Sequence, residues 1–268
     1  MFDEIFVCLD GSPLAEKILP LAHAIANPTG AAITLLRVVE NNRELSAAES
    51  YMRAQAQLCG GAIKFLVSGD PANAIVEELK TRPRAIAAMT THGRTAWTEA
   101  ILGSVALRVM RNSGRPVILF RPQASAGETP EKISTLALAL DGGSNFSEKM
   151  IRYVAEMAKA LAARLLLIQA QPLHPASRDH EAMVVLESSY LHRQAAAIKR
   201  AYGIDADWEV LHGNAATAIC RHVSKMPETM LAMTSHARGG LERAFVGSVT
   251  AACIRKAGVP MMIYWPEK

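Results

Sequence analysis

The chain has 268 residues, of which 50% are hydrophobic and 20% are charged, and its formal net charge is +4 at pH 7. It contains no run of roughly 18 apolar residues, which argues against a membrane-spanning helix and favours a soluble globular protein. Basic residues are spread along the chain rather than clustered, which argues against a nucleic-acid-binding surface. The first residues, MFDEIFVCLD, carry acids where a signal peptide has basic residues, so we expect a cytoplasmic protein.

The four cysteines give no sign of a metal site or a disulfide. Cys8, Cys59, Cys220 and Cys253 form neither a CxxC pair nor a zinc-binding spacing. In a reducing compartment, scattered cysteines usually behave as small buried hydrophobic residues. We therefore predict no metal and no disulfide.

Two similar copies make up the chain. Between them, residues 121–132 (RPQASAGETPEK) are poor in large apolar residues and contain two prolines and a glycine, which indicates a linker. We place the first domain at 1–126, the linker at 127–132 and the second domain at 133–268. The repeated segments are VCLDGS (7–12) with LALDGGS (138–144), GDPANAIVEEL (69–79) with GNAATAICRHV (213–223), MTTHGR (89–94) with MTSHAR (233–238), and ILGSVALRVM (101–110) with FVGSVTAACI (245–254).

Strands and helices are expected to alternate in the same order in both copies. The first strand covers 5–10 (IFVCLD), after which Ser12 is a helix N-cap and Pro13 is the first helical residue. Apolar residues from Leu14 to Ile25 then follow one face of a single helix. Further strands are expected at 31–39, 62–67, 85–89 and 118–120, and at 164–170, 207–211, 230–233 and 262–264, with helices after Pro71, Gly103 and Ala215 and over 181–203.

This alternation predicts an α/β fold. Strands that are apolar throughout belong to a parallel sheet covered on both faces. We expect two tandem Rossmann-like or flavodoxin-like domains, each with a five-stranded parallel sheet and helices on both faces. Ligands of such sheets bind beyond the carboxyl ends of the strands, where loops lead into helix N-termini.

One loop of the first copy has the composition of an anion site. In THGRTAWTEAILGS (91–104), Gly103 and Ser104 open a helix, and a helix start offers free N–H groups and a partial positive charge. Gly93 and Gly103 would let the backbone approach a phosphate, Ser104 would sit at the cap and donate its hydroxyl, and Arg94 would supply charge. The alternative is a turn glycine followed by an ordinary helix start, and spacing alone favours this alternative, because short glycine patterns match by chance.

Taken together, these motifs resemble the universal stress protein family. The resemblance rests on DGS after the first strand, HGR after the fourth, Gly-Ser nine residues later, and GRPVILF at the last strand (114–120). Because the motifs occur twice, the chain is similar to the tandem members. The resemblance implies the fold of adenine nucleotide alpha-hydrolases and the pattern G-x-x-G-x9-G-S/T, which holds the phosphates of ATP in nucleotide-binding members.

Carried onto the first copy, the pattern implies residues for each part of the nucleotide. Asp10 would bind the ribose and Val38 the adenine, while Gly93, Gly103 and Ser104 would bind phosphate. Thr90 replaces the first glycine of the pattern, where a β-branched residue is unfavourable at positive φ and adds a side chain on the phosphate path. The full candidate set is Asp10, Val38, Thr90, His92, Gly93, Arg94, Gly103 and Ser104.

The second copy is expected to be degenerate. It keeps Asp141, but Thr234 and Ala237 replace both loop glycines and Ala170 stands at the adenine position. Losing both glycines removes the close backbone approach on which phosphate binding depends. The residues retained there are Asp141, Gly247, Ser248 and Thr250.

The function implied by the resemblance is that of a stress-response regulator or sensor that binds ATP, with or without magnesium, and has little or no catalytic activity. We expect the two domains to form an intramolecular pseudo-dimer, with a homodimer as a further option. No nucleic acid or membrane partner is expected. Two alternatives stay open: a nucleotide-free scaffold that acts through protein contacts, and a slow ATP hydrolase.

Overall fold

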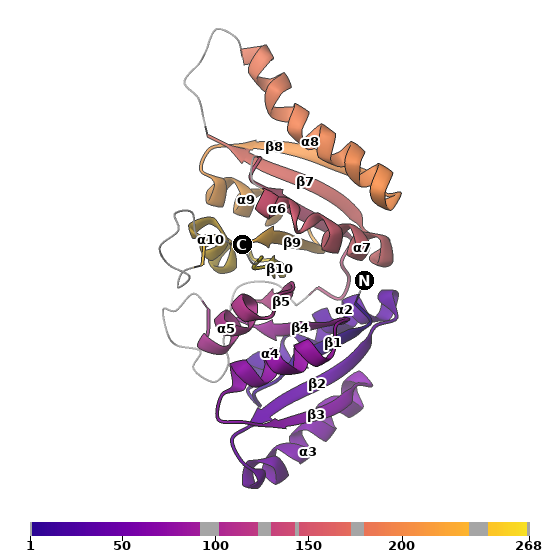
Figure 1. Cartoon of the computed structure of the whole chain (residues 1–268), viewed down its shortest axis with the longest axis vertical. Coiled ribbons are helices and arrows are strands. Elements are labelled where there is room, and N and C mark those ends of the chain that lie inside the picture. The colour runs from indigo at the N-terminus through magenta and orange to yellow at the C-terminus, as the bar shows by residue number, and fades with distance from the viewer. Residues whose placement is uncertain are drawn as a thin grey trace. The chain divides into compact units, whose positions relative to one another are not determined.

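A computed structural model describes residues 2–91, 102–122, 130–142, 145–172, 180–235 and 246–266 (Figure 1). The chain divides into two compact units, one made of residues 1–132 and 262–268 and the other of residues 133–261. Part of the predicted linker, residues 127–129, lies outside the described residues. The proposed domain bounds stay a prediction.

The first unit is built on a parallel sheet. Its strand order is β3-β2-β1-β4-β5, and every neighbouring pair in it runs parallel. Since β1 has β2 on one side and β4 on the other, the direction of strand addition reverses between β1 and β4, which is the point where sheets of this kind open a crevice. The strands are β1 (Glu4–Cys8), β2 (Ala32–Val39), β3 (Ala62–Val67), β4 (Ala85–Thr90) and β5 (Val117–Phe120).

Helices cover both faces of this sheet. The pair α4 and α5 packs side by side on one face, and α2 and α3 contact the strands from the other (Figure 1). This layering follows from right-handed crossovers between parallel strands. The helices are α1 (Pro13–Glu16), α2 (Leu19–Thr29), α3 (Asn42–Cys59), α4 (Pro71–Thr81) and α5 (Ser104–Asn112).

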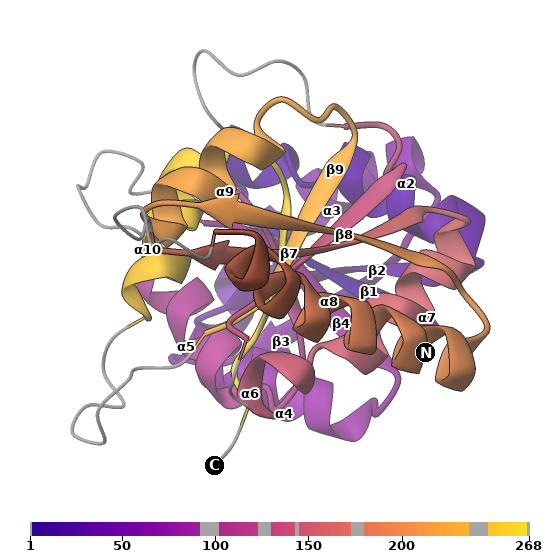
Figure 2. The same ribbon diagram turned by 90° about the horizontal axis from the view of Figure 1, so that it is seen from above.

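The second unit repeats this plan. Its strands follow the order β9-β6-β7-β8 and pair in parallel, and the long helix α8 packs on β8 and β7 (Figure 2). The backbone N–H of Leu231 donates to the carbonyl of Pro260, next to the start of the last strand. The elements are β6 (Thr135–Leu140), α6 (Asn145–Glu148), α7 (Ile151–Leu161), β7 (Arg164–Gln171), α8 (His180–Tyr202), β8 (Ala206–His212), α9 (Ala215–Val223), β9 (Thr229–Thr234) and α10 (Ser248–Lys256). The last strand of the chain is β10 (Met261–Tyr264), which belongs to the first unit from residue 262 on.

Burial follows the position of each strand in its sheet. Every residue of the strands β4, β6 and β9 is buried, whereas β3 and β8 are half-buried or exposed along most of their length. Central strands have a helix layer on each side, which removes their apolar side chains from water. The predicted α/β class and the parallel sheets are therefore confirmed.

The helix predicted after the first strand is wrong in one respect. Ser12 does cap it, since its Oγ accepts from the Ala15 N–H at 3.2 Å, but the helix breaks into α1 and α2 around Lys17 and Ile18. Pro20 lacks an N–H and cannot complete a helical turn with Glu16. The second unit breaks at the same place, between α6 and α7, without a proline, so the break belongs to the fold.

Within the described ranges, none of the helices combines the length and the apolar character that a membrane crossing requires.

Candidate functional site

A cavity of about 310 Å³ opens at the carboxyl ends of the strands of the first unit. Residues that follow β1, end β2 and β4, or begin α5 line it, so it lies at the β1/β4 reversal of the sheet. Six of the lining residues carry the chemistry discussed below: Asp10, Arg37, Val38, Thr90, Gly103 and Ser104.

Asp10 is held by the turn that follows β1. Its Oδ1 accepts hydrogen bonds from the backbone N–H of Ser12 at 2.9 Å and from the Ser12 hydroxyl at 2.6 Å. The same hydroxyl accepts from Ala15 and caps α1. The DGS sequence therefore fixes the orientation of a half-buried carboxylate at the cavity wall. Val38, half-buried near the end of β2, contributes an apolar part of the same wall.

Arg37 is a cavity residue that sequence reasoning missed. It lies in β2, is 8% exposed, and its guanidinium sits directly against Gly11. Gly11 has φ +82°, and a Cβ there would collide with the Arg37 Nη1, so both the backbone and the space require glycine. The sequence signal for Arg37 was a charged residue within the apolar run LLRVV, since an arginine in a buried strand is almost always paired with another group.

The start of α5 differs from the prediction. Gly103, not Ser104, is the N-cap residue, with φ −60° and ψ 151°, and Ser104 is the first helical residue. The Gly103 N–H donates to the Thr91 carbonyl at 2.7 Å and so joins the end of the loop to the end of β4. The helical N–H groups of Ser104, Val105 and Ala106 precede the first i to i−4 bond, and all three residues line the cavity. They, rather than Gly103, are the donors that an anion would meet.

Thr90 does not have the backbone strain that we expected. It is the last residue of β4 and is buried, and the described non-glycine residues with positive φ are Ala162 and Glu228. The first position of the glycine pattern therefore ends a strand instead of forming a turn, and a β-branched residue is suited to a strand. Thr234 occupies the same place at the end of β9.

Four residues of the predicted phosphate loops lie outside the described residues. They are His92, Gly93 and Arg94 of the first copy and Ala237 of the second.

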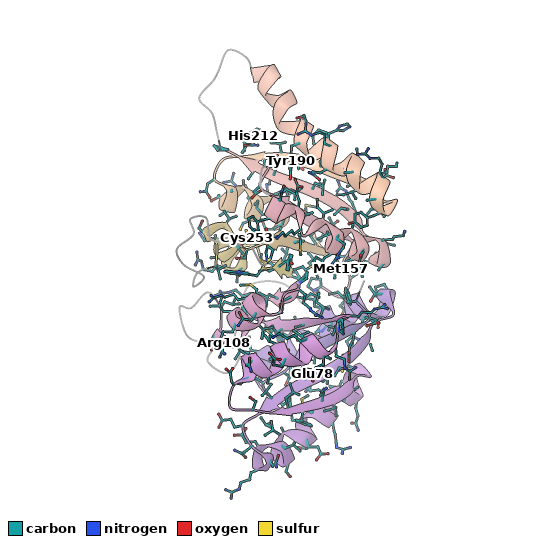
Figure 3. All side chains as sticks on the ribbon, in the orientation of Figure 1. Glu78, Arg108, Met157, Tyr190, His212 and Cys253 are labelled. Atoms are coloured by element: carbon teal, nitrogen blue, oxygen red, sulfur yellow. The ribbon has the colours of Figure 1, made fainter. Side chains whose placement is uncertain are left out.

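An ion pair fixes α5 beside α4. Asp70 caps α4 by accepting from the Asn73 N–H at 3.1 Å, and it accepts from Arg108 of α5 through both oxygens, at 2.9 and 2.6 Å (Figure 3 labels Arg108). A bidentate guanidinium–carboxylate pair restrains orientation as well as distance. Because Ser68 and Pro71 beside Asp70 also line the cavity, this pair links α5 to the same side of the cavity.

The second unit has a corresponding cavity of about 950 Å³. Asp141 accepts from the Ser147 hydroxyl at 2.9 Å, and the buried Thr250 hydroxyl donates to the Thr234 carbonyl at 3.3 Å. Gln169 takes the place of Arg37, since its side chain lies against Gly142, which has φ +77°. The predicted residues that line this cavity are Asp141, Ala170, Thr234, Gly247, Ser248 and Thr250.

Each unit also has a tyrosine near the aspartate of its candidate site that sequence reasoning missed. In the second unit the Tyr190 hydroxyl of α8 donates to Glu148 of α6 at 2.9 Å, and burial, then that glutamate, raise the pKa of Tyr190. In the first unit burial, then the charge of Glu16, raise the pKa of Tyr51 of α3. In both units the charge of the aspartate after the first strand also raises the pKa of the tyrosine. The tyrosine therefore lies close to the candidate site.

The model of the universal stress protein family matches residues 61–121 and 133–264, which is more than half of the chain. Residues 1–60, which include Asp10 and Val38, lie outside the match. No protein with a curated description matches.

Solved structures with the same fold cover nearly the whole chain. A universal stress protein from Archaeoglobus fulgidus DSM 4304 has 19% identity and a TM-score of 0.73, and the match covers 99% of both chains. A functionally unknown protein from Pseudomonas aeruginosa PAO1 has 19% identity and a TM-score of 0.69, with 99% of this chain and 93% of that chain covered. The cytoplasmic domain of a prokaryotic cation chloride cotransporter has 14% identity and a TM-score of 0.58, with 99% and 96% covered. At these identities the likeness shows the fold alone.

We predict that the α4–α5 ion pair makes Asp70 unusually acidic. The Arg108 hydrogen bonds, and after them the Asn73 N–H, hold the pKa of Asp70 below its ordinary value. A lowered pKa means that the pair stabilises the fold above about pH 4 and that this contribution is lost as pH falls through the lowered value. Carboxyl carbon-13 NMR titration should show this low pKa, and Arg108→Ala should raise it.

Arg53→Ala is the matched control, because Arg53 pairs with Glu49 on α3 and not with Asp70. An Asp70 pKa that is the same in wild type and Arg108→Ala would show that the ion pair does not form in solution.

Proposed function

The chain belongs to the universal stress protein family, and from this premise we propose that its first unit binds an adenine nucleotide, with ATP as the expected ligand. In this proposal the bound nucleotide lets the protein act as a regulator or sensor in stress responses. The observation that carries it is the meeting of three groups at one cavity: the Asp10 carboxylate, the apolar Val38 wall and the first turn of α5. A cavity of about 310 Å³ is at the lower end of the range for small-molecule sites.

Each group matches one part of the ligand. An oriented carboxylate such as Asp10 accepts hydrogen bonds from ribose hydroxyls, and a half-buried valine packs against a base. The N–H groups of Ser104, Val105 and Ala106 suit a phosphate, because they carry the positive end of the helix dipole. Arg37 adds a permanent positive charge to the lining, which favours a polyanionic ligand.

We propose that the second unit binds nucleotide more weakly or not at all. Its cavity is larger, but cavity volume does not determine affinity. Gln169 is neutral where Arg37 is charged, and Asn214 and Ala252 stand where Asp70 and Arg108 form an ion pair in the first unit. The second unit therefore lacks one cation in its site and the restraint on its last helix.

The first test places a negative charge where phosphate would bind. In Ser104→Glu the glutamate occupies the first turn of α5, where an acid favours the helix but repels an anion. Two unit charges about 4 Å apart interact by about 4 kcal/mol at an effective dielectric constant of 20, so ATP affinity should fall at least tenfold. Isothermal titration calorimetry on the full chain measures this loss.

Ser248→Glu is the matched control, because Ser248 is the first residue of α10 in the second unit. It should leave ATP affinity unchanged. A loss in Ser248→Glu but not in Ser104→Glu would reverse the proposed asymmetry. No binding of ATP, ADP or AMP by the wild type would favour the nucleotide-free scaffold.

The second test concerns the ribose. Asp10→Asn keeps the side-chain shape but replaces one acceptor oxygen by a donor, so ATP should bind roughly tenfold more weakly, in line with about 1.5–3 kcal/mol for a hydrogen bond to a charged group. For 2′,3′-dideoxy-ATP, which lacks both hydroxyls, wild type and Asp10→Asn should bind equally. Equal losses for both nucleotides would mean that Asp10 does not contact the ribose.

We propose that bound ATP is hydrolysed very slowly or not at all. Phosphoryl transfer needs a positioned metal, an oriented water and cations on the γ-phosphate. One observation favours the hydrolase alternative: Glu40 and Glu44 line the cavity beside Asp10, so it holds more acidic groups than the single carboxylate expected from the sequence. Glu44, however, already accepts from the Glu40 N–H at 3.2 Å, next to Asn41, the N-cap of α3.

Phosphate release under single-turnover conditions with magnesium and excess protein separates these alternatives. We expect a rate far below the roughly 1 s⁻¹ at the slow end of ordinary enzymes. Release at several turnovers per second that disappears in Glu44→Gln or Asp10→Asn would make the protein an ATP hydrolase.

A further inference from the structure

Two cysteines face each other inside the second unit. Cys220 lies on α9 and Cys253 on α10, two helices that pack side by side, and their sulfur atoms are 3.7 Å apart (Figure 3 labels Cys253). Both are buried, with 8% of Cys220 and 1% of Cys253 exposed. The sequence did not indicate this pair, because the two residues are far apart along the chain and neither belongs to a short cysteine motif.

The first unit shows that packing alone does not require these thiols. Its repeated segments place Val76 on α4 and Val109 on α5 at the two corresponding positions, and both valines are buried. A valine pair therefore fills the same helix interface in the same fold. The cysteine pair adds a chemical property that the first unit lacks.

The pair divides into a reactive and an unreactive sulfur. The hydrogen bond with Cys253 lowers the pKa of Cys220 against the effect of burial, and the Lys256 charge acts in the same direction. The same hydrogen bond and burial raise the pKa of Cys253. Cys220, the more exposed of the two, is therefore the sulfur that loses its proton at the lower pH, and the thiolate is the nucleophilic form.

We propose that Cys220 and Cys253 are an oxidation site at which a hydroperoxide converts two thiols into a disulfide. The Cys220 thiolate attacks the peroxide O–O bond, which forms a sulfenic acid and releases an alcohol, or water from hydrogen peroxide. The Cys253 sulfur then displaces the hydroxyl group as water and forms the S–S bond. Two electrons pass from the sulfurs to the peroxide, and the sulfurs close from 3.7 Å to about 2.05 Å.

This bond would act on the second cavity. Ile219, next to Cys220 on α9, lines that cavity, as do Ser248, Val249 and Thr250 in the first turn of α10. A covalent link between α9 and α10 fixes the spacing of these two walls. The oxidation site and the cavity thus share the same pair of helices.

The test treats the full chain with hydrogen peroxide, blocks the remaining thiols under denaturing conditions and digests with trypsin. The expected product is one linked pair of peptides, 201–221 (AYGIDADWEVLHGNAATAICR) and 244–255 (AFVGSVTAACIR), that separates on reduction. Cys8 is an internal control, because burial raises its pKa to about 12 and it should stay reduced. Full blocking of both Cys220 and Cys253 after peroxide, or links that involve Cys8 or Cys59, would overturn the proposal.

Valine variants that copy the first unit separate reactivity from folding. Cys253→Val reproduces Val109, so the protein should fold, as circular dichroism can verify, while Cys220 stops at the sulfenic acid and is trapped by a cyclic 1,3-dicarbonyl reagent. Trapping should become faster as pH rises, because more of Cys220 is then in the thiolate form. Cys220→Val, which reproduces Val76, should abolish trapping. Equal trapping in both variants, or none in either, would contradict the assigned roles.

Discussion

Burial of a parallel sheet on both faces is the constraint from which the other features follow. Parallel strands need crossover helices, and these helices must cover the apolar strands β4, β6 and β9 completely. The carboxyl ends of all strands in a unit then meet at one edge. On the two sides of β1 the connecting helices lie on opposite faces of the sheet. No helix therefore fills that edge next to β1, and a cavity is left. Polar side chains therefore gather there by topology, whichever ligand they serve.

The two units show which parts of this edge the fold requires and which parts vary. Both have an aspartate after the first strand, a positive-φ glycine under a long side chain from the second strand, and a Gly-Ser start of the last helix. The long side chain itself changes from Arg37 to Gln169. The backbone geometry of the site is thus the same in both units, whereas the positive charge is present only in the first. Binding of an anion depends on both the charge and the placement of the donors.

The sequence predicted the features that depend on neighbouring residues. Hydrophobic runs located the strands, with β3 at its predicted bounds, and Ser12 was recognised as a cap because capping acts over three residues. It could not show that Glu40, Glu44 and Arg37 line the cavity, because their neighbours come from other strands and helices. The start of α5 was misplaced by one residue because the Gly103 N–H bonds to Thr91, a partner beyond the loop. The cysteine pair was missed for the same reason.

The interface between the last two helices of each unit links these observations. In the first unit it is fixed near the cavity by the Asp70–Arg108 ion pair, with Val76 and Val109 packed deeper. In the second unit the ion pair is absent, and the deeper positions carry Cys220 and Cys253. An ion pair restrains the helix continuously, whereas a thiol pair restrains it only after oxidation. Since the first turn of the last helix lines the cavity in both units, the same fold has one site with a built-in restraint and one whose restraint depends on redox conditions.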